Sequence, residues 1–160
     1  MKQDCTLNCL PLLLALIEAK YIHVSEIRNL STILNGHELT PQYWLTELSV
    51  CDSIDEAQDI LRKQVHEKHM VFDKHYLSFL CGFLYLGVQE GKISLSEFQA
   101  EFVDVIDAYN DFMGITIEDL QDEFLSMNQL PGQDSLLGRC LIDAAEKSKS
   151  SFGELIAFTN

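Results

Sequence analysis

The sequence predicts an all-α fold: a compact bundle of about eight or nine helices, built from antiparallel helical hairpins in a single domain over residues 1–160. Three observations carry this prediction. No stretch alternates apolar and polar residues as a strand does between turn signals. Only three prolines and eight glycines interrupt the 160 residues. A six-residue helix-start pattern recurs along the chain, and links as short as residues 92–93 favour antiparallel neighbours.

The first predicted helix, 8–20, contains the apolar run "CLPLLLALI" at residues 9–17. This run resembles the apolar core of a secretory signal, but Lys2 is offset by Asp4 and no small-residue cleavage site follows. We therefore expect no cleaved signal. The most apolar segment, 76–88, is shorter than the roughly 20 residues that cross a bilayer, so we expect no membrane span.

The helix-start pattern reads "IHVSEI" from Ile22, "ISLSEF" from Ile93 and "ITIEDL" from Ile115. In the second copy the Ser94 hydroxyl can accept the amide hydrogen of Glu97, whose carboxylate reaches back to the amide of Ser94. The apolar residues at the two ends of each copy form a hydrophobic staple around the cap. The three copies predict helices over 24–35, 95–113 and 117–127.

Two further segments, "LTPQYW" and "FDKHYL", place Thr40 and Asp73 at the same capping position. Pro41 suits the first position of a helix. These segments predict helices over 41–49 and 74–90. The second of them is apolar nearly all round, so we expect it at the centre of the bundle.

Glycines mark several predicted helix ends. Gly36, Gly91 and Gly114 follow such ends, where a left-handed C-cap favours glycine. The segments "EAKYIHVSEI" and "EGKISLSEF" share one helix–turn–helix pattern, although two imperfect copies do not establish a repeat. The remaining predicted helices are 54–68, 134–149 and 152–158.

The charge balance is strongly acidic, with 25 Asp and Glu against 11 Lys and Arg and a net charge of −14. Nucleic acid and anionic membrane both need a basic footprint on the protein, so we expect neither as a direct partner. The balance favours a basic protein partner, or serves solubility alone. The five cysteines form no CxxC pair and are odd in number, which favours reduced thiols and a cytoplasmic location.

Linear motifs for catalysis or cofactor binding are absent from the sequence. The chain has neither GxSxG nor a glycine-rich phosphate loop, so we expect no enzyme activity, no catalytic residue and no cofactor. Placing Gly91 at the sixth position of a calcium loop puts Leu86 and Val88 where carboxylates are needed, so we expect no calcium site. Cys81 lies inside the most apolar helix and is expected in the core.

Three histidines leave one alternative open, a metal site or an enzyme centred on His66, His69 and His75. His66 and His69 are three residues apart, and the turn after Lys68 would have to fold back to bring His75 close. The spacing is not that of HExxH, whose histidines lie four apart. Polar residues at a helix C-terminus, where His and Lys suit the helix dipole, are the preferred interpretation, so no metal is predicted.

Residues 93–138 contain ten acidic residues and no Lys or Arg. On a helix, the first five of these acids fall within an arc of roughly 120°, separate from an apolar arc that faces the core. Neighbouring like charges repel, and a purely structural surface usually mixes both signs. A solvated face, or one covered by basic residues from elsewhere, is the alternative. We name this surface the acidic face; its predicted partner-binding residues are Glu97, Glu101, Asp104, Asp107, Asp111, Glu118, Asp119, Asp122 and Glu123.

This combination of small size, all-helical character and an acidic face resembles the immunity proteins of bacterial toxin systems, including those of contact-dependent growth inhibition. The resemblance implies a non-enzymatic protein that binds one cognate toxin, often a nuclease, over or beside its active site. A helical adaptor that binds its partner through an apolar groove between hairpins is the alternative from another class.

Overall fold

The computed structural model describes residues 5–38, 40–68, 74–109 and 127–160. Every regular element among these residues is an α-helix, which confirms the predicted all-α class. The described helices are α1 (Cys5–Glu18), α2 (Val24–His37), α3 (Tyr43–Val50), α4 (Ile54–Glu67), α5 (Lys74–Gln89), α6 (Leu95–Tyr109) and α8 (Leu136–Thr159).

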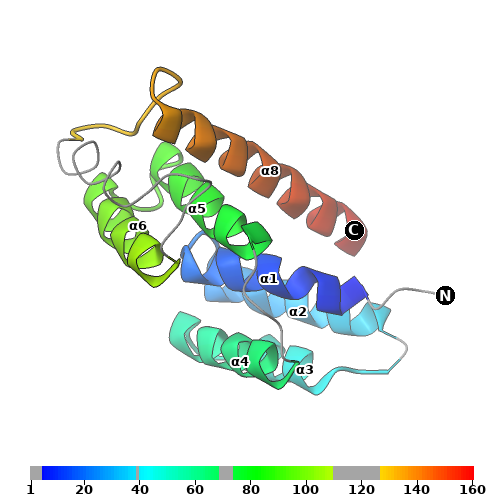
Figure 1. Cartoon of the computed structure of the whole chain (residues 1–160). Helices are drawn as coiled ribbons and strands as arrows, with labels where there is room; N and C mark the ends of the chain where they lie inside the picture. The colour runs from blue at the N-terminus through cyan, green and yellow to red at the C-terminus, as the bar shows by residue number, and fades with distance from the viewer. Residues whose placement is uncertain (1–4, 39, 69–73, 110–126) are drawn as a thin grey trace.

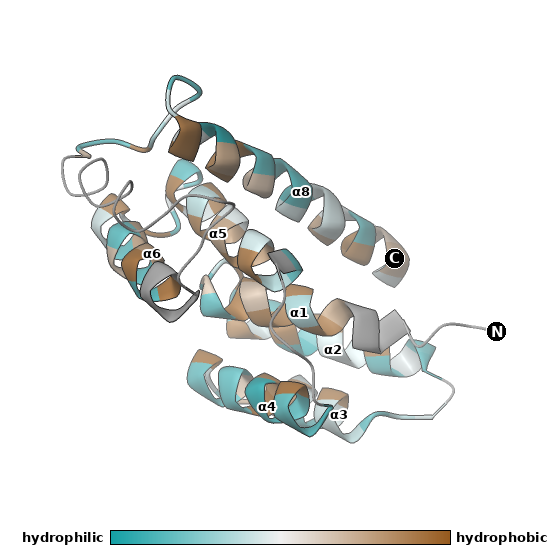
Figure 2. Cartoon of the chain, viewed as in Figure 1, coloured by the Kyte–Doolittle hydropathy of each residue, from teal (hydrophilic) through white to brown (hydrophobic). Residues whose placement is uncertain are grey.

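The helices stack in layers around α5 (Figure 1). α8 lies along one side of α5 and α1 along the other, and α6 also packs on α5. α2 pairs with α3, and α3 and α4 form the layer farthest from α8. In Figure 2, α4 and α6 each carry both hydrophilic and hydrophobic residues, as surface helices do. The packing therefore confirms the central position that the composition of α5 predicts.

The most extensive helix contact in the described chain lies between α5 and α8. Phe83 and Cys81 of α5 are fully buried, as predicted for Cys81. A Cβ placed on Gly82 would come within 2.2 Å of Ser148 Oγ and 2.4 Å of the Ala144 carbonyl oxygen. The absence of a side chain at Gly82 therefore sets how near the two backbones approach. The Ser148 hydroxyl is buried and donates to the Ala144 carbonyl at 2.7 Å.

α1 and α5 end in the same kind of turn. Lys20 and Gly91 have left-handed backbones, with φ of 52° and 71°. In each turn the amide of that residue bonds to the carbonyl three residues earlier, and the next amide bonds to the carbonyl five residues earlier, at 2.7 to 3.1 Å. This pair of bonds is the Schellman motif. The predicted C-cap at Gly91 is confirmed, whereas Lys20 takes the same role without being a glycine.

The two turns also contact each other. The Tyr21 hydroxyl donates to Glu90 Oε1 at 2.8 Å, and Lys92 Nζ donates to the Tyr21 carbonyl at 3.0 Å. The same ammonium lies 3.7 Å from the centre of the Tyr21 ring and 3.3 Å from Glu90 Oε2. We call these three residues the turn clasp. The clasp joins the turn between α1 and α2 to the turn between α5 and α6.

The repeated helix-start pattern acts as a cap at both described copies. The Ser94 amide donates to Glu97 Oε2 at 2.7 Å, and the Glu97 amide donates to Ser94 Oγ at 3.2 Å. At the first copy the His23 amide donates to Glu26 Oε2 at 2.7 Å. The predicted capping box at Ser94 is therefore confirmed. The copy that begins at Ile115 lies outside the described residues.

The start of α3 differs from the prediction. The helix begins at Tyr43 with Gln42 at the N-cap position, two residues later than predicted, and the Gln42 side chain makes no cap bond. Asn35 of α2 holds the backbone just before the helix, because its Oδ1 accepts the amide of Gln42 itself at 2.8 Å. Gly36, predicted just past the end of α2, lies inside a helix that runs to His37.

The two helices predicted over 134–149 and 152–158 are one continuous helix, α8. Leu141, Ala145, Ser148 and Leu155 are all buried along it, so the buried face continues through residues 150–151, which the prediction placed between two helices. Gly153 costs only about 1 kcal/mol inside a helix. All of the predicted helix 117–127 except its last residue lies outside the described part of the chain, so the expected count of eight or nine helices is not confirmed.

Candidate functional site

The described part of the acidic face lies on α6. Glu97, Glu101 and Asp104 are all exposed. On the opposite side of the helix Phe98 and Phe102 are fully buried, with their rings stacked 5.5 Å apart. Burial of the two rings sets the rotation of α6 about its own axis. The acids lie on the opposite side of the helix, so they point to solvent.

The predicted site residues are only partly within the described chain. The structure brings Glu97, Glu101 and Asp104 together on one exposed surface. Asp107 belongs to α6, but its side chain is not described. The remaining predicted residues, Asp111, Glu118, Asp119, Asp122 and Glu123, lie outside the described residues.

Among the described residues, no ion pair involves an acid of this face. The ion pairs found there join Arg28 to Asp52, Arg62 to Glu18, Lys92 to Glu90 and Lys147 to Asp143. Four of the eleven basic side chains are thus paired with acids that lie outside α6. The described acids of α6 carry their charge without a salt bridge from the described chain.

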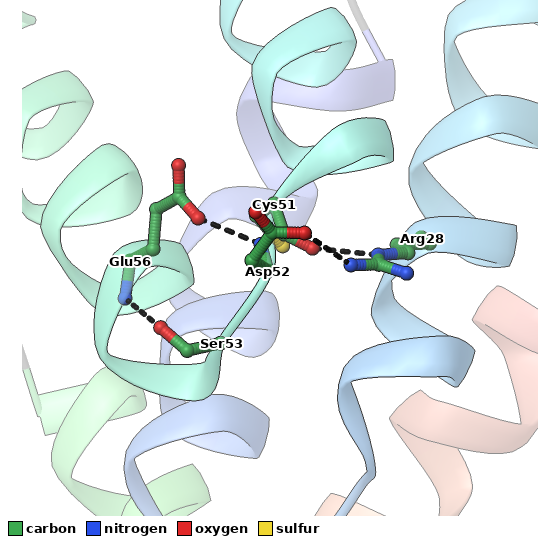
Figure 3. Close-up of polar contacts among 5 residues, drawn as sticks. All are labelled: Arg28, Cys51, Asp52, Ser53 and Glu56. Atoms are coloured by element: carbon green, nitrogen blue, oxygen red, sulfur yellow. Dashed lines mark hydrogen bonds and ion pairs between the residues drawn. The ribbon is translucent and has the colours of Figure 1, made fainter.

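Arg28 illustrates where a basic side chain is held instead (Figure 3). Its Nε donates to the Cys51 carbonyl at 2.6 Å, and its Nη2 lies 3.1 Å from Asp52 Oδ1. Beside it the Asp52 amide donates to Glu56 Oε2 at 2.6 Å, and the Ser53 hydroxyl accepts the Glu56 amide at 3.1 Å. The guanidinium therefore joins the C-terminal end of α3 to α2.

Glu97 has a second role as the capping residue of α6. Hydrogen bonds from the Ser94 amide and then from its hydroxyl lower the pKa of the Glu97 carboxyl, and the charge of Lys20 lowers it further. Both Ser94 bonds reach Oε2. The carboxylate is therefore held in place at the start of α6 with its charge retained.

A small pocket of about 110 Å³ opens beside the acidic face. It lies where the C-terminal turn of α1 meets α5 and the first turns of α6. The walls combine aliphatic side chains with three carboxylates and one ammonium. The lining residues are Glu18, Ala19, Lys20, Leu84, Ile93, Glu97, Ala100 and Glu101.

Glu18 is a member of this site that the sequence reasoning missed. Its side chain is only 15% exposed, and its Oε1 accepts from Arg62 Nε at 2.9 Å and lies 2.8 Å from Arg62 Nη2. The Tyr76 hydroxyl donates to Oε2. Burial raises the pKa of the Glu18 carboxyl, Arg62 opposes this shift, and the charge of Glu101 adds to it. The signal in the sequence is an acid directly after the run of apolar residues in α1.

The predicted alternative centred on histidines gains no support from the described residues. His66 at the end of α4 and His75 at the start of α5 are both exposed, and His69 lies outside the described chain. Within the described ranges no group of three His, Cys, Asp or Glu side chains is arranged to hold a metal ion. No described helix has the length and apolar character needed to span a bilayer.

No protein-family model, no curated protein and no solved structure matches the chain.

Proposed function

We propose that this chain is a non-enzymatic binding protein that neutralises a basic protein partner, and that the partner is a toxin nuclease, so that the chain acts as a cytoplasmic immunity protein. The observation that carries the proposal is the exposure of Glu97, Glu101 and Asp104 on α6 without an ion pair to any described residue. The net charge of −14 adds a negative electrostatic field around the whole molecule.

An acidic face can affect both the rate of association and the position of the bound partner. A surface of one sign attracts a partner of the other sign and raises the association rate, with a strong dependence on salt. The cleft of a nuclease is basic because it binds phosphates. A protein that presents regularly spaced carboxylates on a rigid helix can occupy such a cleft and exclude the nucleic acid. No catalytic group is required for this activity.

The test is a comparison of two charge-matched double variants. Asp104→Lys combined with Asp107→Lys reverses two charges on α6. Asp59→Lys combined with Glu154→Lys makes the same change in net charge on α4 and α8, at residues that are exposed and form no described ion pair. The partner is isolated with the unmodified protein, identified and purified, and its association rate is measured over a series of salt concentrations.

We expect the α6 variant to associate at least about tenfold more slowly at low salt, with a flatter salt dependence, because steering raises association rates by about 10 to 10³-fold. The matched variant should lose much less, since its charges lie away from the docking face. Equal rates for the two variants would rule out the acidic face as the docking surface, and a partner that is not basic would refute the proposal as a whole.

An adaptor function is the second candidate, and one observation favours it. Tyr43 and Val50 are 75% and 69% exposed, and their spacing of seven residues places both on one face of α3. An apolar contact at this face would bind with weak salt dependence. Tyr43→Ser would then weaken binding, whereas the α6 charge reversals would leave it unchanged.

A further inference from the structure

The pocket beside the acidic face has the size of a side-chain tip. Its volume is about 110 Å³, well below the roughly 300–1,000 Å³ of pockets for drug-sized ligands. It therefore suits a small group of heavy atoms, such as the end of one side chain. Its mouth lies on the same surface as Glu97 and Glu101, so a protein docked on α6 would cover it.

The walls fit a side chain that is apolar along its stem and charged at its end. Leu84, Ile93 and Ala100 supply aliphatic surface, of which Leu84 is almost fully buried. Three acidic residues and Lys20 line the same space. Because Arg62 already pairs with Glu18, one negative charge remains in excess. Lysine and arginine place methylene groups along apolar surface and keep the cation at the end.

The carboxylates differ in what already satisfies them. Glu18 is bound by Arg62 and Tyr76, and Glu97 uses Oε2 for its cap. Glu101 forms no ion pair within the described chain, yet its charge opposes ionisation of Glu18 across the pocket. A cation placed between them would relieve this repulsion.

We propose that this pocket receives the tip of one lysine or arginine side chain of the basic protein partner, with Glu101 as its main charged contact and Leu84, Ile93 and Ala100 around its methylene groups. This proposal rests on the proposed function, since it assigns an anchor to the docking face named there. The negative charge of the whole protein would attract the basic partner, and the inserted cationic side chain would then fix the orientation of the complex.

The pocket can be probed on the free protein with n-butylammonium chloride and n-propylguanidinium chloride, which carry the ends of the two side chains. Amide shifts in heteronuclear NMR spectra are followed during titration, with sodium chloride at equal ionic strength as the reference. We expect saturable shifts at Ile93, Ala100 and Glu101 for at least one of the two organic cations. Shifts that grow linearly and match those with sodium chloride would overturn the proposal.

Three variants sharpen the test. Glu101→Gln should weaken the probe about tenfold, because a charge-assisted contact is lost. Asp104→Asn removes the same charge from the same helix outside the pocket and should change the affinity less than about twofold. Ala100→Leu fills the pocket without changing the charge and should abolish saturation. Equal losses for Glu101→Gln and Asp104→Asn, or full binding in Ala100→Leu, would overturn the proposal.

The two proposals can fail separately. If the purified complex forms with steered, salt-dependent association but Ala100→Leu leaves its affinity unchanged, the anchor pocket is refuted and the docking face stands. If the organic cations saturate the pocket while the α6 charge reversals leave association unchanged, the pocket binds cations and the proposed function is refuted.

Discussion

Adding a single methyl group at Gly82 tests the close contact between α5 and α8. In Gly82→Ala the new Cβ would lie 2.4 Å from the Ala144 carbonyl oxygen, where ordinary contacts begin at 3.4 Å. The backbone of α8 must therefore move by about 1 Å, or α5 must move by the same amount, because a carbonyl inside a helix cannot rotate away. Since α5 is central to the bundle, the shift disturbs packing on both of its sides.

The magnitude follows from two opposing effects. Overpacking of a close-packed core costs about 1–3 kcal/mol, and a contact with rigid backbone belongs at the upper end. Alanine gains about 1 kcal/mol over glycine inside a helix. The net loss is then about 2 kcal/mol, which lowers the melting temperature by about 4–8 °C for a chain of this size.

The assay is thermal and urea unfolding followed by circular dichroism, with Gly153→Ala as the matched control. Gly153 also lies within a helix, but an added Cβ there meets nothing within 4 Å. The control should gain up to about 1 kcal/mol, so the two alanine variants should differ by about 3 kcal/mol. Adding Ser148→Ala should not rescue Gly82→Ala, because the Ala144 carbonyl stays in the way.

The reasoning is refuted if Gly82→Ala is as stable as Gly153→Ala. It is also refuted if the double variant with Ser148→Ala recovers fully, since the obstacle would then be a movable hydroxyl and not the backbone of α8.

Two further predictions concern polar residues that join helices. Burial raises the pKa of Glu18 in the folded protein, so the folded state holds the proton of this carboxyl more tightly than the unfolded chain does. This contribution to stability is present below the unfolded pKa and is lost as pH rises through the folded pKa. In urea unfolding, the stability of the native protein relative to Glu18→Gln should therefore fall as pH rises above the ordinary pKa of a glutamate, and a rising difference would contradict the assigned cause. Arg28→Ala should lower the free energy of unfolding by about 1–2 kcal/mol, because the guanidinium bonds to both the Cys51 carbonyl and Asp52. Arg28→Lys should restore little of this stability, because one ammonium cannot reproduce the two-nitrogen geometry of the guanidinium. Full rescue by lysine in the same unfolding assay would contradict this explanation.

The parts of the fold that the sequence predicts are those governed by local interactions. The capping box at Ser94 and the turn at Gly91 depend on residues within one or two turns of helix, and both are confirmed. The central position of α5 follows from its lack of a polar face. The exposure of Glu97, Glu101 and Asp104 follows from their spacing of three to four residues, which places them on one face of α6. Their role in binding stays a prediction.

The features that the sequence does not predict depend on residues distant in the chain. The start of α3 is set by Asn35 of the preceding helix, so the capping signal at Thr40 goes unused. α8 continues past Ser150 because its buried stripe packs on α5, which outweighs the low helix propensity of serine and glycine. Glu18 joins the candidate site only because α1, α4 and α5 meet at its side chain.

The turn clasp has a consequence for the order in which the chain acquires its structure. Each of the two turns closes through bonds between residues three to five apart, but Lys92 meets Tyr21 across 71 residues. Closing a loop of that length costs about 4 kcal/mol of chain entropy, which is offset only after the apolar faces of the helices have packed. We therefore expect the turns to form early and the clasp to close late, so that Tyr21→Phe, which removes the bond to Glu90, accelerates unfolding and leaves the folding rate nearly unchanged.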